Sequence, residues 1–147
     1  MSENNKKMDE YLMTVRSMYE HFKQGDTKWM ISQFKQHPKF QFISQGPFEA
    51  TENGTYKSLA ELEKYFSRCN ENWEITEIKP TEFLKCSDRN AIHVIGEGKG
   101  FYLKSKEKEA VTSFWDHTYW FDGDGMIIKF REVWSAKREN WQKSSNV

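Results

Sequence analysis

The segment that most constrains the fold is residues 113–134, which read SFWDHTYWFDGDGMIIKFREVW. Two stretches in which large apolar side chains alternate with polar ones flank the turn sequence DGDG. Alternation of this kind around a glycine-containing turn is typical of an antiparallel β-hairpin. The sequence therefore predicts a closing hairpin, with one strand at about 110–121 and the other at about 126–135.

The hairpin also predicts which side chains share a face. If Gly123 and Asp124 form the centre of the turn, Trp115 pairs with Glu132 across the two strands. Because side chains alternate along a strand, one face collects the set expected to point into the core: Val111, Ser113, Trp115, His117, Tyr119, Phe121, Met126, Ile128, Phe130, Glu132 and Trp134. His117 and Glu132 are then diagonal neighbours on an otherwise apolar face, and a buried carboxylate needs such a partner.

The rest of the chain supplies helices first and strands later. Apolar residues at spacings of three and four predict helices at 8–23 and 27–35, and the capping box SLAE predicts another after Ser58. A strand is expected at 39–44, a loop at 46–57, a strand bent at Pro80, and a strand at 91–103 that carries three glycines. Helices that lie to one side of a mostly antiparallel sheet make this an α+β fold.

Length and composition limit the classes of protein. The 147 residues fit a single domain, 1–147, with a core at about 8–135 and a polar tail at 136–147 whose one anchor is Trp141. The formal net charge is zero, which argues against nucleic acid or an anionic membrane as a partner. The start is polar and no run is long and apolar enough to span a membrane, so we expect a cytoplasmic protein.

No cofactor or metal is expected. The chain has no glycine-rich phosphate loop, and neither Cys69 nor Cys86 stands at a spacing typical of zinc ligands or of a disulfide framework.

Three stretches in this order resemble one superfamily: YEHFKQGDTKWMISQF, GTYKSLAELEKYF and FWDHTYWFDGDGMIIKFREVW. The first is similar to the end of the first helix, the Gly-Asp turn and the short second helix of the nuclear transport factor 2-like superfamily, in its SnoaL-like and ketosteroid-isomerase-like branch. The second is similar to the loop that leads into the third helix of this superfamily, and the third to its closing hairpin. The resemblance implies a strongly curved, mixed or antiparallel sheet, packed against three helices to form a cone with an internal pocket. It also implies a homodimer through the outer sheet face, where we expect Phe114, Trp120 and Val133.

The resemblance carries over to few functional positions. His117 matches the place where ketosteroid isomerases hold the acid that hydrogen-bonds the substrate oxygen, and Glu132 matches a catalytic carboxylate of limonene epoxide hydrolases. The isomerases' general base would match Phe42, and their first-helix tyrosine falls near Met18. Both groups are therefore missing, as is the hydrolases' Arg-x-Asp pair, and neither of these two reactions is expected.

Two functions from different classes follow. In the first, the protein is an isomerase, dehydratase or cyclase that moves a proton on an apolar small molecule. His117 and Glu132 would be the catalytic pair, and the pocket wall would be Trp115, Tyr119, Phe130, Trp134, Phe42 and Met18. In the second, His117 is a core histidine satisfied by Glu132, and the fold binds a ligand or a protein without chemistry. The discriminating feature is whether the cone is open as far as His117.

Overall fold

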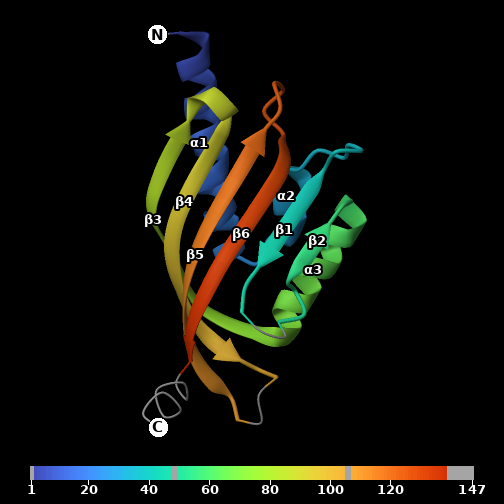
Figure 1. The fold of residues 1–147 in the computed structure, drawn as a ribbon, viewed down its shortest axis with the longest axis vertical. Helices are drawn as coiled ribbons and strands as arrows, with labels where there is room; N and C mark the ends of the chain where they lie inside the picture. The colour runs from blue at the N-terminus through green and yellow to red at the C-terminus, as the bar shows by residue number, and fades with distance from the viewer. Residues whose placement is uncertain (1, 48–49, 105–106, 139–147) are drawn as a thin grey trace.

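A computed structural model describes residues 2–47, 50–104 and 107–138 of the chain. Three helices lie on one side of a six-stranded, open sheet (Figure 1). The elements follow one another as α1 (Glu3–Lys23), α2 (Thr27–Ser32), β1 (Gln41–Gln45), β2 (Gly54–Tyr56), α3 (Leu59–Asn72), β3 (Trp73–Cys86), β4 (Ala91–Tyr102), β5 (Glu109–Phe121) and β6 (Ile127–Arg138), with a short 3₁₀ turn between β3 and β4. The predicted α+β fold is confirmed.

The helices begin where the sequence provides side-chain caps. Ser2, Asp26 and Ser58 each accept a hydrogen bond from a backbone N–H in the first turn of α1, α2 and α3 respectively. Gly25 has a φ of 72°, which lets the chain turn sharply between α1 and α2. α1 is longer than predicted because its first turn is polar all round and gives no apolar periodicity.

The sheet runs in the order β2-β1-β6-β5-β4-β3, and it is mixed because β1 pairs with β6 in parallel. The expected loop at 46–57 contains β2, a short strand that pairs with β1 and was not predicted. The tail predicted from residue 136 also needs correction, since β6 continues to Arg138 and Ala136 is buried. Trp141 lies outside the described residues.

Curvature of the sheet comes from two irregularities in β3 and from glycines in β4 (Figure 1). Register shifts occur between Ile75 and Glu77 and again next to Pro80, where a bend was predicted. A Cβ at Gly96 would lie 2.3 Å from the ring of Trp115 in β5. The glycine therefore lets the indole lie flat against the sheet, which helps to enclose a space between sheet and helices.

The closing hairpin forms as predicted, but its register is shifted by two residues. His117 lies directly opposite Glu132, and Trp115 opposite Trp134. Two features cause the shift. The turn is longer than assumed, because the Asp122 side chain accepts from the backbone N–H groups of two later turn residues. In addition, a bulge interrupts the pairing between Trp120 and Phe121. The same bulge turns Ile127 into the core in place of Ile128, correcting the predicted face at that end.

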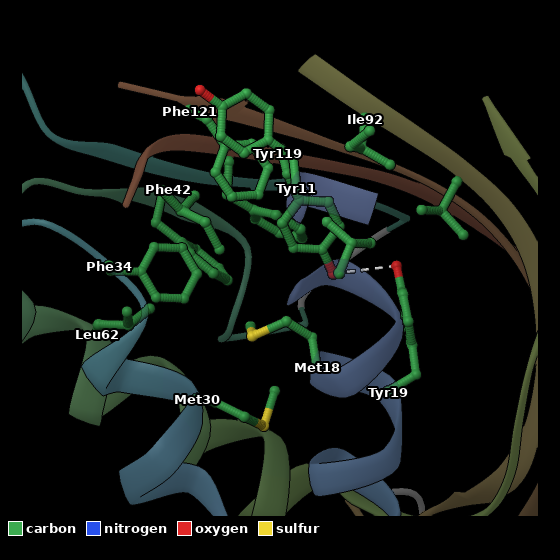
Figure 2. Packing of buried hydrophobic residues seen from close by; sticks show 14 of the residues in the cluster. Tyr11, Met18, Tyr19, Met30, Phe34, Phe42, Leu62, Ile92, Tyr119 and Phe121 are labelled. Carbon is green, nitrogen blue, oxygen red and sulfur yellow. Dashed lines mark hydrogen bonds between the residues drawn. The ribbon is translucent and has the colours of Figure 1, made fainter. Parts of the chain in front are cut away.

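The core is aromatic and lies between the sheet and the helices. Figure 2 shows Met18 of α1, Met30 of α2 and Phe34 converging on the same region. On the outer face of the sheet, Phe114 and Val133 are 49% and 45% exposed, and Trp120 lies beneath the side chains of Lys129 and Arg131. The outer face thus carries the apolar residues expected there. No helix in the described part of the chain is long and apolar enough to cross a membrane.

Candidate functional site

A cavity of about 150 Å³ lies between the sheet and the helices. Its lining includes every residue that the sequence analysis proposed for a site: Met18, Phe42, Trp115, His117, Tyr119, Phe130, Glu132 and Trp134. These residues come from α1, β1, β5 and β6, so the fold brings together side chains up to 116 positions apart in sequence, from Met18 to Trp134. Their functional roles remain predictions.

A second hollow adjoins the cavity. A recess of about 580 Å³ is bounded by the end of α1, the end of α3 and the first half of β3. The recess and the cavity share the lining residues Phe22, Phe66, Cys69, Trp73, Ile75, Glu77 and Ile78. The cavity and the recess are therefore adjacent.

Glu132 is the centre of the polar contacts in the cavity. Its Oε2 lies 2.6 Å from Nε2 of His117, and its Oε1 accepts hydrogen bonds from the hydroxyls of Ser44 at 2.9 Å and Tyr65 at 3.1 Å. Burial alone would raise the pKa of the Glu132 carboxyl. The hydrogen bond and charge attraction from His117, with the two hydroxyls, outweigh burial and hold that pKa below its usual value. Glu132 is therefore an ionised carboxylate.

His117 links Glu132 to two tyrosines by hydrogen bonds. Its Nδ1 lies 2.8 Å from the hydroxyl of Tyr19, and Tyr119 donates to that same hydroxyl at 3.0 Å (Figure 2, dashed line). Because the Tyr19 oxygen accepts from Tyr119, the Tyr19 proton points to Nδ1, and the proton of a neutral His117 then lies on Nε2, facing Glu132. The result is a continuous chain from Tyr119 through Tyr19 and His117 to Glu132.

The aromatic rings around His117 fix its plane. Trp115 stacks on the imidazole with ring centroids 4.1 Å apart and an angle of 18° between the planes. The His117 side chain is only 7% exposed. Burial, followed by interactions with Tyr119 and Glu132, raises the pKa of the Tyr19 phenol well above its usual value, so Tyr19 keeps its proton.

Tyr19 is a residue of the candidate site that the sequence reasoning missed. The isomerases' first-helix tyrosine was expected near Met18, which is no tyrosine, and the next residue of α1 places a tyrosine hydroxyl against His117. The helical spacing of Tyr19 with Val15 and Phe22 indicated an inward position, but it gave no sign of the contact with β5. Met18 and Tyr19 both line the cavity, because adjacent positions of a helix can flank one buried face.

Glu52 and Tyr65 were also missed. Glu52 is 3% exposed and lines the cavity, and its two carboxylate oxygens accept from the side chains of Asn72 and Trp73, each at 2.6 Å. It lies in a stretch read only as loop, where no periodicity marks burial. These contacts tie the segment between β1 and β2 to the junction of α3 and β3.

No three His, Cys, Asp or Glu side chains among the described residues are grouped so that they could hold a metal ion. The site is thus an apolar cavity with one ionised carboxylate–histidine pair and two phenols directed at it. Such a set can bind a small ring compound and can accept or return a proton.

Comparison with known proteins identifies the fold. No protein-family profile matches the sequence, and no curated protein matches it. Among solved structures, an NTF2-like protein of unknown function from Burkholderia pseudomallei is 19% identical, with 90% of each chain covered and a TM-score of 0.69. A protein from Bacillus subtilis provisionally named an isomerase is 14% identical, with 91% of this chain and 89% of that chain covered and a TM-score of 0.69.

A third similar structure is that of TerC co-crystallized with polyporic acid. It is 16% identical, with 84% of this chain and 90% of that chain covered and a TM-score of 0.67. Together these similarities show that the chain has the NTF2-like fold, as the sequence resemblance implied.

Proposed function

We propose that this protein binds a small, mainly apolar ring compound in the cavity and moves a proton on it through Tyr19, His117 and Glu132. The observation that carries the proposal is the hydrogen-bond chain from Tyr119 to Glu132, which lies in the wall of an otherwise aromatic cavity. Buried ionisable side chains with shifted pKa values, hydrogen-bonded to one another in a cavity, are typical of sites that catalyse proton transfer.

The size of the cavity sets the size of the ligand. An apolar cavity of about 150 Å³ accommodates a molecule such as benzene. The cavity in this protein has the same volume and an aromatic wall. The substrate class is therefore a compact ring compound, and larger molecules would extend toward the recess between α1, α3 and β3.

The hydrogen-bond chain from Tyr119 to Glu132 acts as a base through the hydroxyl of Tyr19. Both nitrogens of His117 are already hydrogen-bonded within the protein, so His117 reaches a ligand only through the Tyr19 hydroxyl. As a ligand proton moves to the Tyr19 oxygen, the Tyr19 proton moves to Nδ1 of His117. The imidazolium that forms is stabilised by the Glu132 carboxylate and by the face of Trp115.

Return of the proton completes the reaction. If it returns to a different carbon of the ligand, the product is an isomer. If it returns to a leaving hydroxyl, the products are an alkene and water. If the carbanion first attacks a carbonyl within the same ligand, the proton returns to the new alkoxide and a ring has closed. These are the isomerase, dehydratase and cyclase reactions that the sequence analysis considered.

Three solved structures of the same fold support a proton-transfer reaction on a small molecule. TerC was co-crystallized with polyporic acid, and the similar protein from Bacillus subtilis is provisionally named an isomerase. A protein from Mesorhizobium loti provisionally named a SnoaL-like polyketide cyclase has a TM-score of 0.60 at 15% identity, with 82% of this chain and 96% of that chain covered.

Hydrogen–deuterium exchange tests the proposal without knowledge of the natural substrate. The protein is incubated in D₂O with cyclohexanone, cyclohex-2-enone or acetophenone, and loss of the protons next to the carbonyl is followed by NMR. We expect exchange faster than in buffer, and a decrease of at least about tenfold for Tyr19→Phe. Tyr11→Phe is the matched control, since Tyr11 is a buried tyrosine on the same helix and also donates one hydrogen bond, to the Asp122 carbonyl.

A second candidate function is ligand binding without chemistry. The observation in its favour is that Tyr119, Tyr19, His117 and Glu132 are already hydrogen-bonded to one another, as in a stable core. Exchange that is equally fast with Tyr19→Phe would refute the proton relay. Binding of the panel compounds with no exchange above buffer would favour the binding module.

We also propose that two copies of the chain associate through the outer sheet face. The exposed side chains of Phe114 and Val133 lie on this face, together with Ile95, which is 37% exposed. Apolar side chains grouped on one surface are typical of an interface.

A further inference from the structure

One buried hydrogen-bond donor in the cavity wall has no partner. Trp115 is 6% exposed, and its Nε1–H makes no hydrogen bond within the described part of the chain. The other two tryptophans that line the cavity differ from it, because Trp73 donates to Glu52 and Trp134 donates to Asn53. An indole N–H is nearly always paired when it is buried, since an unpaired donor loses its bond to water and gains nothing.

The position of the indole shows where a partner would lie. The six-membered ring of Trp115 covers Gly96, whereas Nε1 lies 3.7 Å from the point that a Cβ on Gly98 would occupy. The hydroxyl oxygen of Ser113 is 2.9 Å from that same point. Gly98 and Ser113 both line the cavity, so the free N–H and a hydroxyl border the same part of the floor.

Because Gly98 has no side chain, the cavity extends to the backbone of β4 at this position. Gly98 and Ser113 face each other across β4 and β5, and any larger residue at position 98 would meet the Ser113 hydroxyl. The Trp115 Nε1–H and the Ser113 hydroxyl thus both lie near Gly98 in the wall of the cavity. Both belong to β5, which pairs with β6, the strand that carries Glu132. Both groups can donate a hydrogen bond and both lie near this point, and a carbonyl oxygen carries two lone pairs, so one such oxygen can accept from both donors.

We propose that the Trp115 Nε1–H and the Ser113 hydroxyl form a binding subsite for a carbonyl oxygen of the ligand. The inference rests on the proposed function only in that the ligand occupies the same cavity, and it identifies the substrate class as carbonyl-bearing ring compounds. The ring would lie against the aromatic wall while the carbonyl points to the floor at Gly98, away from the Glu132 end of the hydrogen-bond chain.

Four matched ligands test the subsite by binding alone. Cumene, acetophenone, 4-isopropylphenol and 4-hydroxyacetophenone differ only in whether an isopropyl or an acetyl group is present and whether a hydroxyl is present. Dissociation constants are measured by NMR titration for the wild type, Trp115→Phe and Tyr19→Phe. Because each acetyl compound is compared with its isopropyl counterpart, any effect of Trp115→Phe on cavity size cancels.

We expect the acetyl compounds to bind about fivefold more tightly than their isopropyl counterparts, as one neutral hydrogen bond allows. Trp115→Phe should remove this preference, and Tyr19→Phe should leave it intact. If the preference is absent in the wild type, or survives in Trp115→Phe, the subsite does not exist. If it disappears only in Tyr19→Phe, the carbonyl binds at Tyr19 and the inference is wrong.

A measurement on the wild type covers the case in which Trp115→Phe does not fold. The indole N–H of Trp115 is identified in a ¹H–¹⁵N spectrum from its contacts with the α-protons of Gly98. Acetophenone should shift this proton downfield, and cumene should shift it far less. An equal shift with both compounds would overturn the inference. Neither experiment depends on proton transfer, so failure of the exchange assay and failure of the subsite are distinguishable.

Discussion

Replacement of Glu132 by glutamine tests whether the carboxylate holds the buried hydrogen-bond chain together. The amide oxygen can still accept from Ser44 and Tyr65, which now donate to Oε1. The amide nitrogen then meets Nε2 of His117, which also carries a proton, at a place where the two atoms are now 2.6 Å apart. In this orientation two donors face each other in a region from which water is largely excluded. In the reversed orientation the amide N–H groups face the hydroxyls of Ser44 and Tyr65, which now donate. In both orientations the charged acceptor of three hydrogen bonds is lost.

The expected loss follows from what is removed. A hydrogen bond to a charged group contributes about 1.5–3 kcal/mol, and a buried donor that is left without a partner costs about 1–3 kcal/mol. The Glu132 side chain is 16% exposed, which places the combined effect toward the lower end, at about 3 kcal/mol. For a chain of this length, that lowers Tm by roughly 10 °C.

Urea unfolding followed by tryptophan fluorescence measures this change. Glu82→Gln is the control, because Glu82 is exposed on β3, and the same chemical change there should alter the free energy of unfolding by less than about 0.5 kcal/mol. If Glu132→Gln is as stable as Glu82→Gln, the contacts of Glu132 do not stabilise the fold and the account of the buried chain fails.

Three further predictions follow. First, the Glu132 pKa is lowered in the folded state, so its contribution to stability is complete above pH about 4.3 and is lost as the pH falls through the lower, folded value. Urea unfolding between pH 6 and pH 3 should therefore show a steeper decrease for the wild type than for Glu132→Gln, and parallel curves would contradict this. Second, Gly96→Ala places a Cβ 2.3 Å from the Trp115 ring and should cost about 1–3 kcal/mol. Gly123→Ala, in open space, should cost much less, and equal thermal stability of the two variants would refute the packing argument. Third, Phe114→Glu should convert a dimer to a monomer in sedimentation velocity while circular dichroism shows that the variant is still folded, whereas a monomeric wild type would disprove the dimer.

Most of the fold could be predicted because its elements carry strong local signals. The caps at Ser58 and Asp26 and the alternation along β5 depend only on neighbouring residues. β2 was missed because three residues, of which one is a glycine, show no usable alternation. The register of the hairpin was wrong because it depends on how the Asp122 side chain folds the turn, and sequence spacing does not show this.

The candidate site was predictable in part for the same reason. His117 and Glu132 stand out as ionisable groups on an apolar strand face, and the structure places them opposite each other. Tyr19 and Tyr65 come from helices, and their contacts with β5 and β6 depend on how the helices pack on the sheet. A tyrosine on an apolar helix face looks like any other core aromatic until its hydroxyl partner is known.

The protonation of His117 tests the central claim most directly. If the chain from Tyr119 to Glu132 acts as a base, the free protein must hold His117 as a neutral imidazole with its proton on Nε2 and its Nδ1 accepting from Tyr19. A long-range ¹H–¹⁵N correlation spectrum of the histidines at pH 8, assigned with His117→Gln, distinguishes the forms. The account predicts the Nε2–H tautomer. A proton on Nδ1, or on both nitrogens, would leave His117 unable to take the Tyr19 proton and would contradict the proposed reaction.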